Sequence, residues 1–297
     1  MKSPITFISQ ILFLNAMIYG CGSSTKPENP SICELNLEPI CTGTQTDGKS
    51  INIVAVVKGG SVLSAYLKLN LNNAKSSIGE KKIFQFSQVG NQETQINLAK
   101  ISRDDPNSPM TFTYEYKWKW GRLNQPHDDI LYRLPYNAGE VFKVMQGYNS
   151  SYSHNGSLEN SLDFDLPEGS EIVAARSGKI IGIKQDSSEG GTDKEKYSAL
   201  ANYVMIAHSD NTVGAYMHLK KDGALVEVGE EVSTGDIIGL SGNTGWSTAP
   251  HLHFHVATNY IDAEDNLAIS TVATKFITKE TTSAVLIEGQ SYEAVDF

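Results

Sequence analysis

Three of the seven histidines in this 297-residue chain lie within the stretch GNTGWSTAPHLHFHVA. They are His251, His253 and His255, separated by Leu252 and Phe254. Residues two apart on a β-strand point to the same face, so the three imidazoles would share one face of a strand. Two such neighbours can reach one metal ion or a water beside it, and imidazole suits zinc. The alternative is a row of polar side chains on an exposed strand face.

Further metal ligands must come from elsewhere, because a catalytic zinc site needs three protein ligands and an open position. The segment YSHNGSLENSLDFDLPEG supplies His154, Asp163 and Asp165. The segment AYMHLK supplies His218 at the end of an expected strand, on the opposite face from Met217. A carboxylate among imidazoles is a normal zinc ligand, and no cysteine stands near these histidines, so a cysteine-based zinc site is not expected.

The elements around these candidates are predicted to be β-strands, since apolar or aromatic residues alternate with polar ones. In the first half the pattern occurs in INIVAVV, AYLKLNLN and TFTYEYKWKW, and in the second half in EIVAARSGKIIGIK, NYVMIAH and TVGAYMHL. The aromatic row from Phe112 to Trp120 favours a packed core or a domain contact, with sugar binding as the alternative. No long amphipathic helix and no repeat is found. The sequence predicts an all-β chain with a small N-terminal β-sandwich-like domain over residues 50–140.

Composition and charge limit the partners of this chain. Apolar residues make up 40% of it, which is enough to bury a core. Its formal net charge is −10, and it lacks the clustered Lys and Arg that phosphate contacts require. No nucleic acid is therefore expected as a partner.

The N-terminal stretch MKSPITFISQILFLNAMIYGCGSS has an apolar run that is too short to span a bilayer. We interpret residues 1–20 as a secretory signal peptide. IYGC resembles a bacterial lipobox, which predicts lipidation of Cys21 and a lipidated polar tether over residues 21–49; ordinary cleavage nearby is the alternative. Cys33 and Cys41 would then be free to pair outside the cytoplasm, or would remain as two thiols.

Taken together, these segments resemble the LytM/lysostaphin-type zinc endopeptidases, which cut cell-wall peptides. The likeness covers roughly residues 146–257 and includes, in order, LDFDLPEGSEIVAARSGKI, NYVMIAHSDNTVGAYMHL and VEVGEEVSTGDIIGLSGNTGWSTAPHLHFHV. It implies a LytM-type antiparallel β-sheet catalytic domain of the duplicated hybrid motif fold. We expect this peptidase domain over residues 141–262, followed by a C-terminal β extension over residues 263–297.

The resemblance also implies a role for each residue of the site. His154, Asp163 and His253 match the three ligands of a single Zn2+ ion. His218 and His251 match the two non-ligand histidines, which orient or deprotonate the attacking water and stabilise the oxyanion that forms.

Three further residues need separate expectations. His255 stands where relatives often carry Glu or another residue, so it is expected to be a variable position near the ligands or at the surface, and not a ligand. Asp165 would share a face with Asp163 and is expected to be solvated, with a second cation as the alternative. Glu159 lies four residues before Asp163 and could compete with His154 as a ligand.

The predicted function is a zinc metalloendopeptidase that hydrolyses peptide cross-links of bacterial peptidoglycan, with the peptide stems and, through the lipid anchor, the membrane as partners. The expected location is the cell envelope, as an outer-membrane-anchored lipoprotein facing the periplasm, or otherwise as a secreted protein. One alternative is a non-catalytic envelope protein of the same fold that binds peptidoglycan or activates another hydrolase. Another is a metal-storage or carbohydrate-binding β protein. The remaining histidines, His127 and His208, are expected at the surface.

Overall fold

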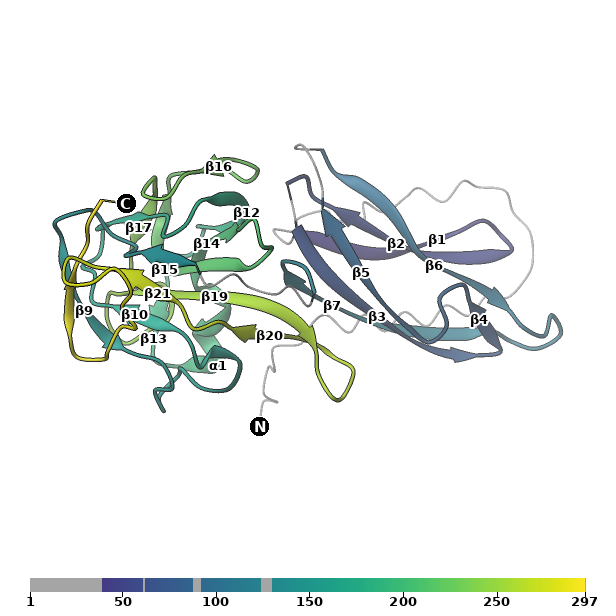
Figure 1. The fold of residues 1–297 in the computed structure, drawn as a ribbon. Coiled ribbons are helices and arrows are strands. Elements are labelled where there is room, and N and C mark those ends of the chain that lie inside the picture. Colours follow the sequence, from purple (N-terminus) through teal and green to yellow (C-terminus); the bar gives the residue numbers. More distant parts are fainter. Residues whose placement is uncertain (1–38, 61, 88–91, 124–129, 297) are drawn as a thin grey trace. The chain divides into compact units, whose positions relative to one another are not determined.

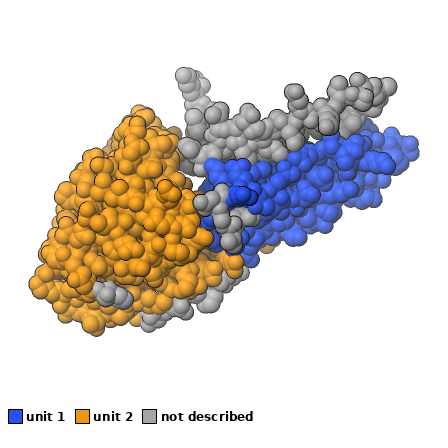
Figure 2. Space-filling model, turned by 90° about the horizontal axis from the view of Figure 1, so that it is seen from above, with its two compact units in different colours: residues 1–119 blue, residues 120–297 orange. Residues whose placement is uncertain are grey.

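The structure, a computed structural model, describes residues 39–60, 62–87, 92–123 and 130–296. The chain divides into two compact units, Met1–Lys119 and Trp120–Phe297 (Figures 1 and 2). Both are built almost entirely from β-strands, which confirms the predicted all-β class. Among the described residues no helix is long and apolar enough to cross a membrane. The predictions for Cys21, Cys33 and His127 fall outside the described residues.

The first unit holds two sheets, in keeping with the sandwich-like domain that the sequence predicts. One sheet has the order β1-β2-β6-β4, with β1 (Ile40–Thr46), β2 (Ser50–Val57), β6 (Thr94–Arg103) and β4 (Ala74–Ser76). The other has the order β5-β3-β7, with β5 (Lys81–Ser87), β3 (Val62–Asn72) and β7 (Thr111–Trp120). Phe112 and Tyr114 of the aromatic row are buried, whereas Tyr116 and Trp118 are partly buried. Cys41 is disulfide-bonded.

The second unit is organised around one large sheet whose main path is β16-β12-β14-β15-β19-β10-β9-β22 (Figure 1). These strands are β16 (Glu231–Val232), β12 (Gly178–Lys184), β14 (Asn202–Ala207), β15 (Val213–Ala224), β19 (Leu252–Ile261), β10 (Leu162–Phe164), β9 (Val141–Gln146) and β22 (Ser291–Glu293). Three more join it, namely β11 (Glu171–Val173), β17 (Ile237–Ser241) and β20 (Leu267–Thr271). All of the pairings in this sheet are antiparallel.

Smaller elements lie in the connections of this unit. The parallel pairs are β8 (Leu131–Arg133) with β21 (Lys275–Ile277), and β13 (Gly190–Gly191) with β18 (Gly245–Trp246). The helical turns are η1 (Gly156–Leu158), α1 (Lys194–Tyr197) and η2 (Ser198–Leu200). Beyond residue 262, β20, β21 and β22 pair with β19, β8 and β9. The expected domain boundaries at residues 140/141 and 262/263 stay a prediction.

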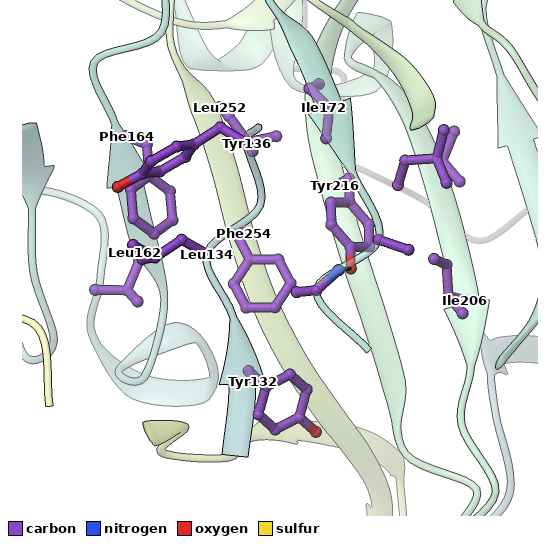
Figure 3. Close-up of a cluster of buried hydrophobic side chains, with 14 of the residues drawn as sticks. Tyr132, Leu134, Tyr136, Leu162, Phe164, Ile172, Ile206, Tyr216, Leu252 and Phe254 are labelled. Carbon is purple, nitrogen blue, oxygen red and sulfur yellow. Dashed lines mark hydrogen bonds between the residues drawn. The ribbon is translucent and has the colours of Figure 1, made fainter. Parts of the chain in front are cut away.

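The core of the second unit fixes which way β19 faces. Leu252, Phe254 and Val256 are essentially fully buried. The ring of Phe254 lies 5.1 Å from that of Tyr216 on β15, centroid to centroid (Figure 3). Burying a side chain of this size stabilises the fold by about 1.5–3 kcal/mol. Because strand residues alternate between faces, this packing turns His253 and His255, and His251 just before the strand, to the opposite face of the sheet.

Candidate metal centre

Two neighbouring strands bring a carboxylate and an imidazole together. In the β10–β19 pair, Asp163 stands directly opposite His253, so both side chains project from the same face. Leu162 and Phe164, on either side of Asp163, are buried in the core and hold its orientation. The Nδ1 atom of His253 lies 2.9 Å from Oδ1 of Asp163. The two residues are 90 positions apart in the sequence, and strand pairing alone makes them neighbours.

His154 completes this group from the loop that follows β9. Its ring is fully buried, and its Nδ1 donates to the carbonyl oxygen of Gly147 at 3.0 Å. The other ring nitrogen, Nε2, lies 3.2 Å from Oδ1 of Asp163 and is buried without a hydrogen-bond partner. An unprotonated, unpartnered imidazole nitrogen buried beside a carboxylate is suited to a metal ion.

His154, Asp163 and His253 form a group that could hold a metal ion, with one ligand atom from each lying within 4.8 Å of the others. Two imidazole nitrogens and one carboxylate oxygen are the donor set of many three-ligand zinc sites, so these residues fit zinc. Burial by itself would raise the pKa of Asp163, but the adjacent imidazoles of His154 and His253 hold that pKa well below its usual range. The carboxylate is therefore charged and available as a ligand.

Two further histidines stand beside this group in a defined tautomer. The Nδ1 atom of His218 lies 2.6 Å from the carbonyl oxygen of Thr244, and Nδ1 of His251 lies 2.8 Å from that of Ala249. A carbonyl oxygen can only accept, so in each neutral ring the proton is on Nδ1 and Nε2 carries a free lone pair. The Nε2 atom of His251 lies 3.8 Å from Oδ1 of Asp163, so this lone pair is turned towards the candidate metal group.

Solvent exclusion keeps His218 neutral. Desolvation of its ring, followed by the nearby His251 and His253, lowers the pKa of His218 to about 3. The rings of His218 and His251 are 4.6 Å apart, centroid to centroid. Two imidazoles in such close contact cannot both be charged without strong repulsion. At neutral pH the unprotonated Nε2 of His218 can therefore accept a hydrogen bond.

A β-bulge places His218 in the cleft, which corrects the expectation that it faces away from Met217. Asn202 pairs with Leu219 and Tyr203 pairs with Met217, so His218 is an extra residue on β15. Its φ of 65° lies in the left-handed region, which is uncommon for a residue other than glycine. Such strain costs about 1–3 kcal/mol and is concentrated at functional sites. As a result Met217 and His218, although adjacent, both line the cleft.

The candidate metal group opens into a cleft of about 580 Å3. Four of the five predicted site residues of the peptidase domain line this cleft, while His154 lies fully buried behind it. The side walls are apolar, aromatic and hydroxyl-bearing, with a single lysine: Met145, Gln146, Tyr152, Ser153, Leu158, Lys194, Ser198, Ala201, Met217, Trp246, Ser247 and Thr248. A cleft of this size can hold a few residues of an extended peptide.

The structure favours one of the two expectations for His255, a position near the ligands, and corrects the expectation for His208. His255 is not at the surface: its ring is buried, and its Nδ1 lies 3.0 Å from Nε2 of His253. On β19 it stands opposite Ala215 of β15, and its ring centroid lies 5.2 Å from that of His253. His208 is also buried, with its Nδ1 hydrogen-bonded to the carbonyl oxygen of Ser177.

Neither of the other two acidic candidates joins the metal group. Asp165 and Glu159 are both exposed. The group that lies around Asp163 takes His154 and not Glu159. Sequence reasoning missed the carbonyl oxygens of Gly147, Thr244 and Ala249, which set the histidine tautomers. A backbone carbonyl leaves no signal in residue type, so no pattern could have identified them.

Comparisons with known proteins agree with this site. Residues 157–264 match peptidase family M23. An uncharacterized metalloprotease of Buchnera aphidicola is 40% identical over 119 residues, which is 39% of this chain and 28% of that protein. The peptidoglycan DD-endopeptidase ShyA of Vibrio cholerae is 36% identical over 97 residues, covering 33% of this chain and 20% of that protein.

The lysostaphin of Staphylococcus simulans is 38% identical over 106 residues, covering 35% of this chain and 19% of that protein. The solved catalytic domain of this lysostaphin covers 42% of the chain and 85% of its own length at 29% identity, with a TM-score of 0.29. This chain thus spans 19% to 28% of the length of these curated relatives. The segment that matches peptidase family M23 contains Asp163, His218, His251 and His253.

Proposed function

We propose that this chain is a zinc-dependent endopeptidase that hydrolyses peptide cross-links of bacterial peptidoglycan. In this proposal Zn2+ is held by His154 Nε2, Asp163 and His253 Nδ1, and His218 and His251 assist the reaction. The observation that carries the proposal is the convergence of three candidate ligand atoms beside a cleft that His218 and His251 also line. The names of the relatives ShyA and lysostaphin support a cell-wall substrate.

The proposed mechanism follows from the protonation states of the two assisting histidines. When bound, zinc supplies a Lewis acid that polarises the scissile carbonyl and acidifies the attacking water. His251, whose Nε2 lone pair is turned towards Asp163, accepts a proton as the water oxygen adds to the carbonyl carbon. The imidazolium then returns this proton to the amine as the C–N bond breaks.

His218 acts beside His251, with the two ring centroids 4.6 Å apart. Its unprotonated Nε2 accepts a hydrogen bond that orients the water, because its own Nδ1 proton is held by the carbonyl oxygen of Thr244. The positive charge formed on the imidazole pair during the reaction lies close to the negative charge that develops on the carbonyl oxygen. Electrostatic stabilisation of this kind is strong where water is excluded.

The alternative function is a non-catalytic envelope protein of the same fold that binds peptidoglycan or activates another hydrolase. The experiment that separates the two combines metal analysis with a peptidoglycan digest read by mass spectrometry. We expect one zinc per chain, release of cross-linked peptides as monomers, loss of this release with a chelator and recovery with added Zn2+. Stoichiometric zinc without any cleavage would support the alternative, and absence of zinc would contradict both the metal assignment and the mechanism.

The location of the protein is part of the same proposal. A cell-wall hydrolase must reach the envelope, and the IYGC stretch that ends at Cys21 has the features of a lipidation signal. We propose that a lipid on Cys21 attaches the protein to the outer membrane, facing the periplasm. A bacterial diacylglyceryl group provides the two acyl chains that stable anchoring requires.

A further inference from the structure

One wall of the cleft carries a lysine that is held by an indole ring. Trp246, on β18, donates from Nε1 to the carbonyl oxygen of Thr192 at 3.1 Å, which fixes the ring. The Nζ atom of Lys194, the first residue of α1, lies 4.6 Å from the centroid of that ring. The ring of Tyr152 stacks on the same indole at 5.7 Å and 25°. All three of these side chains line the cleft that contains the candidate metal group.

The charge of Lys194 is not neutralised by the protein. No ion pair involves Lys194 in the part of the chain that the structure describes. Its neighbours Asp193 and Glu195 do not line the cleft, and the Asp193 carboxylate accepts a hydrogen bond from the backbone N–H of Lys196. A cation–π contact orients an ammonium while leaving its charge and its N–H groups free for another partner.

Among the described residues that line the cleft, Lys194 is the only lysine or arginine and Asp163 is the only carboxylate. Asp163 is already engaged by His154 and His253. A carboxylate on the substrate could therefore bind the oriented ammonium of Lys194 without competition from a protein carboxylate in the cleft. In a chain with a formal net charge of −10, such a positively charged position in the cleft favours an anionic ligand locally.

We propose that Lys194, held on Trp246, binds a carboxylate of the peptide substrate and makes the site selective for cross-linked stem peptides that carry one, over neutral bridges such as oligoglycine. This rests on the proposed endopeptidase function and adds the class of peptide to it. The carboxylate can be a free C-terminal carboxylate of a stem or a side-chain carboxylate beside the scissile bond. Both offer the same chemistry to the ammonium.

The test uses the full, zinc-loaded chain and three synthetic cross-linked peptides. The first keeps all carboxylates, the second has its C-terminal carboxylates converted to carboxamides, and the third has its side-chain carboxylates converted instead. The variants are Lys194→Met and Lys194→Glu. Lys196→Met is the matched control, because Lys196 lies on the same helix, bonds to the hydroxyl of Tyr197 and does not line the cleft.

We expect the wild-type protein and Lys196→Met to prefer the carboxylate form by about threefold to fivefold in kcat/KM at low salt. The preference should arise from a lower KM. It is small because Lys194 is exposed, and exposed ion pairs are weak. Lys194→Met should lose this preference and Lys194→Glu should reverse it. The amidated peptide that the wild-type protein cleaves less efficiently identifies which carboxylate, C-terminal or side-chain, binds Lys194. Equal cleavage of all three peptides by the wild-type protein, or an unchanged preference in Lys194→Met, would overturn the proposal.

Binding of the same peptides, measured by calorimetry, separates this proposal from the function on which it rests. If no peptide is cleaved although zinc is bound, the endopeptidase function fails. The role of Lys194 is then judged by whether binding of the carboxylate form weakens in Lys194→Met and not in Lys196→Met. If cleavage is normal and the carboxylate preference is absent, only the role of Lys194 fails.

Discussion

The Nε2 atom of His253 lies 3.0 Å from the Nδ1 atom of His255, and both imidazoles are buried. His253 thus has its two ring nitrogens in different contacts, with Nδ1 at 2.9 Å from Oδ1 of Asp163. A metal-ligating histidine characteristically has its second nitrogen fixed by a hydrogen-bond partner, which sets the ring orientation and the tautomer. His255 occupies that position for the candidate ligand His253.

We predict that His255→Phe weakens zinc binding by about 10- to 100-fold, the usual cost of losing such a partner. Phenylalanine fills the buried space but cannot hydrogen-bond to His253. His255→Gln, which keeps a polar side chain, should retain more of the affinity. Zinc affinity is measured by competition with a chelator, and unfolding of the metal-free proteins is the control for a general loss of stability. Equal affinity in all three proteins would mean that the contact does not position His253.

We predict that His253→Ala abolishes metal retention, because His154 and Asp163 alone would hold zinc poorly. The measurement is zinc content after gel filtration. His251→Ala is the matched control, since it removes an imidazole from the same strand region without removing a proposed ligand. A near-normal zinc content in His253→Ala would contradict the ligand assignment.

We predict that His218→Ala and His251→Ala keep their zinc and lose about 10²- to 10⁴-fold in activity, the range for general acid–base groups. Both rings have their Nδ1 atoms near carbonyl oxygens and present Nε2 to the reaction. Peptide cleavage and zinc content are measured on the same samples. If zinc is lost in proportion to activity, the division between ligands and assisting residues is wrong.

We predict that the stability of the protein decreases as the pH falls from about 6.5 towards 4, in part because of His208. Burial lowers the pKa of His208 to about 4, so in this window the unfolded chain binds a proton that the folded chain does not. The stabilisation is complete above pH 6.5, and at one pKa unit per 1.36 kcal/mol the loss amounts to roughly 3 kcal/mol.

His208→Gln tests the pH prediction because glutamine can still donate to the Ser177 carbonyl oxygen but does not titrate. Urea unfolding at several pH values should give a shallower decline for the variant than for the wild-type protein. The metal centre is unchanged between the two proteins, so the difference in slope isolates His208. Parallel curves would show that His208 does not contribute.

We predict that the full chain sediments with membranes and that Cys21→Ser does not. Cys21 lies outside the described residues, so this prediction depends on the IYGC stretch and on the polar tether that follows it. Fractionation of the envelope, with the mature N-terminus read by mass spectrometry, is the measurement. A soluble wild-type protein with an unmodified N-terminus would indicate ordinary secretion.

The sequence by itself determined the all-β class and the common face of His251, His253 and His255. Both depend on local alternation: when Leu252 and Phe254 are buried, the residues between them must point the other way. The types of the candidate ligands could also be predicted from the sequence, because zinc is bound by imidazole and carboxylate groups.

Only the tertiary structure decided which of these residues meet. The pairing of β10 with β19 joins Asp163 to His253, and no local rule specifies a register between strands so far apart in the sequence. The bulge that turns His218 into the cleft depends on how β14 pairs with β15, so strand alternation gave the wrong face. His255 is buried by tertiary packing that its position on the strand does not specify. The contact of Lys194 with Trp246 depends on the approach of α1 to β18. These contacts join residues that are far apart in the sequence, so no single stretch of residues is sufficient to predict them.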